Sequence, residues 1–172
     1  NVSNSSTNSI IGNYIGVSSS GFNDVGNTHD GIAMSNSYYN NILGNVIGGN
    51  NEKGINISYG IGDNILGNYI GVDPDGSSTS IGNDQDGIYL EGSTANYIGD
   101  GTVLGRNIIS NNGLSGVVIS GTATNNRILG NYIGTKPDGL SPLGNNTGIW
   151  LEGNGVNVKL GNYIGDGTEG GR

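Results

Sequence analysis

The chain has 172 residues, which suits a single domain, and it combines 35 Gly with only 12% charged and 6% aromatic residues. Its formal net charge is −8 and its six Lys and Arg form no basic run, which excludes nucleic-acid binding and disfavours a polyanionic sugar as substrate. The sequence contains no apolar run long enough to span a membrane and no Cys for disulfides or thiolate zinc sites.

The first predicted element is a strand within a repeated phrase, which reads Ile-Ile-Gly-Asn-Tyr-Ile-Gly at residues 10–16. Related copies follow at residues 42–48, 65–71, 128–134 and 159–165, with a degenerate copy at 97–100 that continues into 107–110. A disordered Gly-rich segment does not keep Ile at fixed offsets from Gly and Asn. The spacing therefore predicts an ordered repeat.

A second phrase, of the form Gly-Ile-x-Leu, is interleaved with the first. Its copies lie at residues 31–34, 54–57, 87–90, 116–119 and 148–151. Apolar side chains occupy the second and fourth positions of each copy, which is the period of a strand with one buried face.

Together the two phrases give three short strands per repeat, separated only by Gly- and Asn-rich turns. No segment between the strands is long enough for a crossover helix, which excludes a doubly wound fold. Equivalent residues recur in the same chain direction, which favours parallel stacking. We therefore predict an all-β fold, a right-handed parallel β-helix of about six coils, formed by residues 1–172 as one domain.

In such a solenoid, equivalent residues lie directly above one another. Ile residues of successive repeats then stack inside, and the Asn residues of the first phrase form a ladder at one corner, where their amides hydrogen-bond along the stack. The predicted ladder consists of Asn13, Asn45, Asn68, Asn131 and Asn162.

The residues resemble a group of secreted bacterial and archaeal proteins that carry parallel β-helix repeats. The resemblance covers essentially the whole chain and is clearest in residues 105–110, 135–139 and 144–148. It implies the same fold and an extracellular or cell-surface location. It does not imply an activity, because many activities share this scaffold.

No catalytic constellation of β-helix enzymes is found in the sequence. Arg106, Arg127 and Arg172 lie in separate coils without a neighbouring Asp cluster, unlike the sites of pectate lyases. The motifs of polygalacturonases are absent, and Asp73-Pro74 matches only the start of the uronan epimerase motif. We therefore expect that the protein is not an enzyme and needs no cofactor.

Two kinds of side chain still deserve a test. The only His, His29, is a potential general base. However, the residue type at its position in the repeat differs between coils, which is typical of an exposed turn. Four carboxylates are candidates for binding calcium, although Asp-Pro-Asp-Gly is equally an ordinary turn. These candidates are Asp73, Asp75, Asp84 and Asp86.

Tyr residues of the first phrase also align along the predicted stack. An outward aromatic row is able to stack on sugar rings, or it simply covers the sheet and supports its strands. The row predicted from the repeat consists of Tyr14, Tyr69, Tyr132 and Tyr163.

The two ends of the chain read as one interrupted repeat. Gly171-Arg172 followed by Asn1-Val2 completes a phrase Gly-Arg-Asn-Val, which resembles Gly-Arg-Asn-Ile at residues 105–108. Either chains stack head to tail into a homopolymer, or the chain is a segment of a longer tandem array. We predict a non-catalytic extracellular structural protein, a rod that forms a filament or part of a larger surface protein, with a carbohydrate-binding or polysaccharide-degrading module as the alternative.

Overall fold

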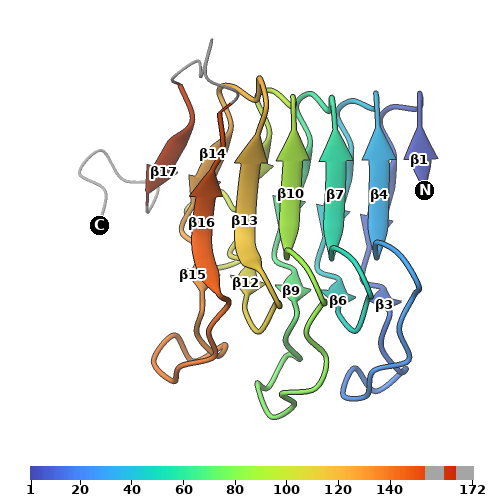
Figure 1. The fold of residues 1–172 in the computed structure, drawn as a ribbon, viewed down its shortest axis with the longest axis vertical. Coiled ribbons are helices and arrows are strands. Elements are labelled where there is room, and N and C mark those ends of the chain that lie inside the picture. The colour runs from blue at the N-terminus through green and yellow to red at the C-terminus, as the bar shows by residue number, and fades with distance from the viewer. Residues whose placement is uncertain (154–160, 166–172) are drawn as a thin grey trace.

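The computed structural model describes residues 1–153 and 161–165, and in this part of the chain every regular element is a β-strand. Figure 1 shows the strands side by side along one axis, with β1 at one end and β16 and β17 at the other. Each of the first five coils contributes one strand to each of three parallel sheets, and the last described coil adds β16 and β17 to two of them. The chain is therefore a right-handed parallel β-helix, as the sequence predicted.

The three sheets, here named A, B and C, run along the rod in coil order. Sheet A consists of β1 (Val2–Ser3), β4 (Ile32–Ser35), β7 (Ile55–Ser58), β10 (Ile88–Glu91), β13 (Ser115–Ser120) and β16 (Thr147–Leu151). Sheet B consists of β2 (Ser9–Ile11), β5 (Asn41–Leu43), β8 (Asn64–Leu66), β11 (Tyr97–Ile98), β14 (Arg127–Leu129) and β17 (Tyr163–Gly165). Sheet C consists of β3 (Tyr14–Ile15), β6 (Val46–Ile47), β9 (Tyr69–Ile70), β12 (Ile108–Ile109) and β15 (Tyr132–Ile133).

The interior is a stack of Ile side chains, because each strand turns alternate residues inward. Ile47, Ile65 and Ile88, one from each sheet, are completely buried. Burying one such side chain contributes about 2 kcal/mol. The columns of stacked Ile are therefore the main apolar source of stability.

The corner between sheets B and C is a Gly-Asn step. Gly12, Gly44, Gly67 and Gly130 hold φ between 61° and 68°, in the left-handed region that only Gly enters without a penalty. This turn directs the side chain of the following Asn into the corner of the coil.

Three coils carry longer loops between sheets C and A, at residues 16–31, 71–87 and 134–146. Figure 1 shows these loops projecting on the same side of the rod. The Ser78 hydroxyl donates to the Phe22 carbonyl at 3.0 Å, which joins the first two loops. The described residues include no helix with the length and apolarity needed to cross a membrane.

Candidate functional site

Side-chain amides form hydrogen-bonded ladders along the corners of the rod. In all but one step, the ladder oxygen accepts from the backbone N–H of the equivalent residue one coil earlier, and in most steps it also accepts from that residue's Nδ2. The exception is Asn50, whose Oδ1 accepts from Asn27 Nδ2 alone among the described residues. Asn45 Oδ1 accepts from Asn13 N at 2.9 Å and Asn13 Nδ2 at 3.1 Å. Asn68 Oδ1 accepts from Asn45 N and Nδ2 at 2.9 and 3.0 Å. Because buried amides need partners, the ladders fix the register of one coil on the next.

Each of the three corners has its own ladder. The ladder between sheets B and C contains Asn13, Asn45, Asn68, Asn107 and Asn131. The ladder between sheets A and B contains Asn8, Asn40, Asp63, Asn96, Asn126 and Asn162. The ladder between sheets C and A contains Asn27, Asn50, Asn83, Asn112 and Asn145.

The predicted ladder differs from the observed one in its last member. The structure places four of its residues in the B–C ladder: Asn13, Asn45, Asn68 and Asn131. Asn107, which the sequence analysis left out, supplies the remaining coil. The placement of Asn162 was wrong, because its Oδ1 accepts from Asn126 N and Nδ2, both at 3.0 Å. Asn162 precedes β17, which pairs with β14 in sheet B.

The ladders have a direction. At the first coil, the Oδ1 atoms of Asn8, Asn13 and Asn27 accept no hydrogen bond from any described residue. At the last coil, Asn131 and Asn145 each donate one Nδ2 hydrogen to a carbonyl of the coil before. Within the described part, their backbone N–H groups and second Nδ2 hydrogens have no acceptor. Among the described residues, the ladders thus end in free acceptors at the first coil and in free donors at the last coil.

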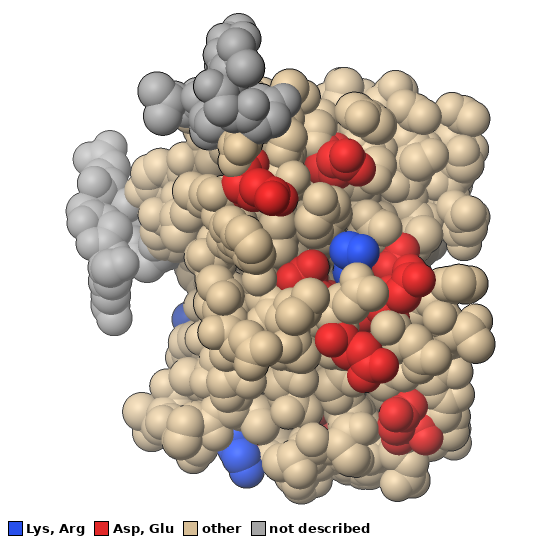
Figure 2. All heavy atoms as spheres, in the orientation of Figure 1, with Lys and Arg blue, Asp and Glu red and all other residues tan. Residues whose placement is uncertain are grey.

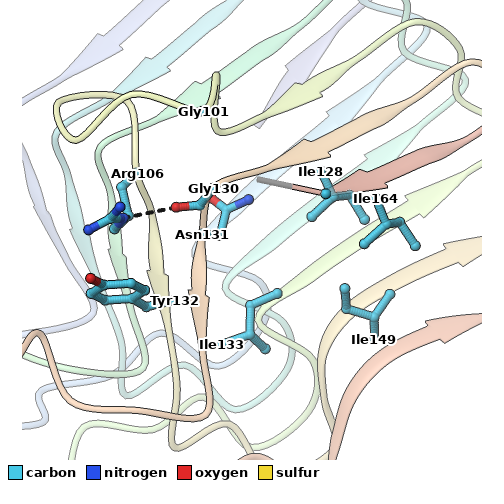
Figure 3. Close-up of a pocket in the computed structure, with 10 residues that line it drawn as sticks. Gly101, Arg106, Ile128, Gly130, Asn131, Tyr132, Ile133, Ile149 and Ile164 are labelled. Carbon is cyan, nitrogen blue, oxygen red and sulfur yellow. Dashed lines mark hydrogen bonds between the residues drawn. The ribbon is translucent and has the colours of Figure 1, made fainter. Parts of the chain in front are cut away.

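The end of the rod near β15, β16 and β17 is hollow, with a cavity of about 570 Å³. Figure 3 shows Ile side chains from the inward positions of the coil lining it: Ile128, Ile133, Ile149 and Ile164. At its rim, Arg106 Nε donates to the Gly130 carbonyl at 2.9 Å, and the guanidinium lies 4.0 Å from the centre of the Tyr132 ring. This end therefore exposes core residues beside one fixed cation.

The predicted residues at the junction of the chain ends are only partly placed. Asn1 is exposed, and Val2 begins β1 and pairs with Met34 on β4 in sheet A. The predicted match of the first residues to the phrase at 105–108 was therefore wrong, because that phrase leads into β12 of sheet C. Gly171 and Arg172 lie outside the described residues.

The predicted Tyr row is shorter than expected and is partly covered. Tyr14, Tyr69 and Tyr132 share one outward row of sheet C. Tyr163 does not belong to it, because it lies on β17 in sheet B, opposite Arg127. A Cβ atom added at Gly21 would lie 2.9 Å from the Tyr14 ring, which shows how closely that loop packs on it. The row therefore supports the loops and offers no continuous aromatic platform.

The four calcium candidates serve separate roles. Asp73 is buried, and its Oδ1 accepts from the backbone N–H groups of Asp75 and Ser77, both at 3.1 Å, so it closes its own turn. Asp75 and Asp84 are exposed, whereas Asp86 is buried and accepts from Ser115 N at 2.9 Å. No group of three or more His, Cys, Asp or Glu side chains placed to hold a metal occurs in the described ranges.

His29 lies on the surface, and its Nδ1 is 3.1 Å from Glu52 Oε1. This exposed pair joins the first loop to the next coil. The expectation that the protein is not an enzyme stays a prediction.

A pocket that the sequence analysis missed lies on the outward face of sheet A. Tyr89 on β10 and Trp150 on β16 flank Val118 on β13, and the three residues form one cross-strand row. The pocket has a volume of about 150 Å³ and is also lined by Asp86 and Glu152. Figure 2 shows acidic side chains gathered on this face of the molecule. The sequence signal for this pocket was the third position of the Gly-Ile-x-Leu phrase, which is occupied by Tyr in one coil and by Trp in another.

Comparison with known proteins gives one family. The model of a protein family described as "Periplasmic copper-binding protein (NosD)" matches residues 2–167. No curated protein and no solved structure shows significant similarity to the chain.

Proposed function

The chain belongs to the NosD family, and on this basis we propose that it is a non-catalytic structural β-helix of the cell envelope whose coils join end to end. The description of the family as periplasmic supports the location. The observation that carries the end-to-end joining is the direction of the corner ladders, with unpaired acceptors at the first coil and unpaired donors at the last described coil.

The side chains of this chain do not fit the copper site that the family description implies. Copper sites in proteins mostly use Cys, His and Met ligands, or for Cu²⁺ a planar set of nitrogen and oxygen ligands, and the described residues contain no group of three or more His, Cys, Asp or Glu placed to hold a metal. The sequence has no Cys, one His and one Met. Met34 is buried in the apolar core, whereas His29 is exposed and contacts Glu52. The role proposed for this chain therefore does not depend on copper.

We expect titration with Cu⁺ or Cu²⁺ to give no tight one-to-one complex and no shift of the thermal midpoint. Isothermal titration calorimetry and thermal unfolding measure these two quantities. His29→Ala is the control, since any weak surface binding should disappear with the only imidazole. A stoichiometric complex that survives this substitution would contradict the assignment.

In the proposed assembly, the first coil of one copy continues the last coil of another. The Oδ1 atoms of the first coil then accept from the ladder N–H groups of its neighbour, with the geometry found between coils within the chain. Ile10 and Ile15, which are only partly buried at the first coil, supply the apolar contact for the neighbour's hollow end. Such a contact is heterologous and does not close, so it produces a filament.

We expect the purified protein to form thin rods whose length increases with concentration, as seen by electron microscopy and sedimentation velocity. Ile10→Lys should raise the concentration needed for assembly by about tenfold or more, because an unpaired charge would enter an apolar contact. Ile11→Lys is the matched control, since Ile11 is the next residue of β2 but its side chain is 58% exposed.

Circular dichroism establishes that both variants keep the wild-type fold. Single short particles at every concentration of the wild-type protein would refute the assembly. Equal assembly of the Ile10→Lys and Ile11→Lys variants would also refute the proposed contact.

A further inference from the structure

The pocket on sheet A contains a carboxylate oxygen that has no hydrogen-bond partner in the part of the chain that the structure describes. Asp86 is only 7% exposed, and its Oδ1 accepts from Ser115 N at 2.9 Å. Its Oδ2 accepts no hydrogen bond from any described residue, yet it is not sealed from solvent. Because Asp86 lines the pocket, this oxygen is reached from there.

An equivalent Asp two coils earlier shows what the pocket lacks. Asp30 accepts from Lys53 N at 3.1 Å through Oδ1, just as Asp86 accepts from Ser115 N. Its Oδ2 accepts from Asn56 Nδ2 at 2.8 Å. In the coil that follows Asp86, the position of Asn56 is occupied by Val118, which has no donor. Val118 therefore explains both features of the site. It has no amide to donate to Asp86 Oδ2, and it does not fill the space that the Asn side chain fills in the earlier coil.

The walls of the pocket suit a flat ligand that carries hydroxyl groups. Tyr89 and Trp150 lie two strands apart, about 10 Å along the rod, and the buried side chain of Val118 forms an apolar floor between them. Trp150 is 52% exposed, so one face of its ring is open. Glu152 adds a second carboxylate, which accepts from the Ser120 hydroxyl at 3.0 Å through Oε2 and leaves Oε1 unpaired among the described residues.

We propose that this pocket binds one sugar residue of a neutral or amino-sugar glycan. The C–H face of the pyranose ring packs on the aromatic side chains and Val118, and a hydroxyl or ammonium group donates to Asp86 Oδ2. The carboxylates of Asp86 and Glu152 repel uronic acids. Lys53, whose Nζ donates to Gln85 Oε1 at 3.1 Å and lies 5.2 Å from the centre of the Tyr89 ring, supplies one positive charge against these two carboxylates and therefore offsets them only in part.

The test uses the fluorescence of Trp150, the only Trp in the chain, with calorimetry as the second measurement. The probes are cello-oligosaccharides, chitosan oligosaccharides, oligogalacturonates and an oligolysine peptide. We expect saturable binding of the first two probes and none of the oligogalacturonates.

Val118→Asn should weaken glycan binding at least about tenfold, because the new amide fills the pocket and donates to Asp86 as Asn56 does to Asp30. This variant should fold at least as well as the wild type, so lost binding cannot be attributed to unfolding. Ala33→Asn is the matched control, since it places the same amide in the same outward row of sheet A, three strands away from Val118. Trp150→Ala, followed by calorimetry, should likewise reduce binding.

Three results would overturn the proposal. The first is no binding of either uncharged or amino-sugar probe to the wild-type protein. The second is unchanged binding by the Val118→Asn variant. The third is tighter binding of oligolysine than of any glycan, which would assign the pocket to a basic peptide.

Discussion

Replacing Asn68 with Ala should lower the free energy of unfolding by about 4 kcal/mol. Asn68 is completely buried, and its Oδ1 accepts from Asn45 N and Nδ2 at 2.9 and 3.0 Å. Its Nδ2 donates to the Ile42 carbonyl at 2.9 Å and to Asn107 Oδ1 at 3.0 Å. Alanine would leave several of these partners buried without a hydrogen bond, each at a cost of about 1–3 kcal/mol.

Asn64→Ala is the matched control for this substitution. Asn64 lies on β8 in the same coil, is only partly buried and makes one side-chain hydrogen bond, from its Nδ2 to Asn41 Oδ1 at 3.0 Å. Its loss should cost less than about 1 kcal/mol. Denaturant unfolding followed by circular dichroism compares the two variants, and equal losses would show that the ladder does not fix the coils.

The architecture was predictable because the repeat directly encodes the period of the stack. Ile42, Ile65 and Ile128 were aligned by their Gly-Asn neighbours, and the structure places all three in the inward column of sheet B. In a solenoid, a residue's environment is set by its coil neighbours, so one repeated phrase determines most of the fold.

The last coil was misaligned because sheets B and C share the letters Asn-Tyr-Ile-Gly. Asn68 and Asn131 begin this phrase in sheet C, whereas Asn96 and Asn162 begin it in sheet B. The residues that follow distinguish the two cases: Asp-Gly-Thr follows at 100–102 and 166–168, but Val-Asp-Pro or Thr-Lys-Pro follows in sheet C. With this distinction, Asn162 and Tyr163 are assigned to sheet B from the sequence alone.

The pocket on sheet A was not predictable in the same way. It depends on which residue lies above Asp86 in the next coil, and coil lengths vary. The step from Asn40 to Asp63 is 23 residues, whereas the step from Asp63 to Asn96 is 33 residues. The Gly-Ile-x-Leu repeat aligns Val118 with Asn56, but only the structure reveals that Asn56 donates to the Asp of the preceding coil, and hence that Asp86 lacks this donor.

The A–B ladder contains one carboxylate, Asp63, where every other member is Asn. Its Oδ1 accepts from Asn40 N and Nδ2, both at 2.8 Å, so it receives the bonds that an Asn would receive. Its Oδ2 takes the place of the amide nitrogen and, among the described residues, has no hydrogen-bond partner, although it is buried. At the equivalent atom, Asn126 donates to the Ser93 carbonyl at 2.9 Å and to Asn162 Oδ1 at 3.0 Å. An ionised Asp63 has no hydrogen to donate in either direction.

Asp63→Asn should therefore stabilise the protein at neutral pH by about 1–3 kcal/mol, because it restores the missing donors. Burial raises the pKa of Asp63 above its ordinary value of 3.8. The folded state of the wild-type protein thus holds this proton to higher pH than the unfolded state does, so the contribution of Asp63 to stability is greatest below the ordinary value and falls as pH rises through the folded pKa. The advantage of the variant should accordingly shrink as pH falls and be smallest below the ordinary pKa.

Denaturant unfolding at a series of pH values measures the difference in stability between the Asp63→Asn variant and the wild type. Asp84→Asn is the control, because it removes an exposed carboxylate of the same charge. If Asp63→Asn gains no more than this control at neutral pH, or gains the same amount at every pH, the carboxylate is not a strained member of the ladder.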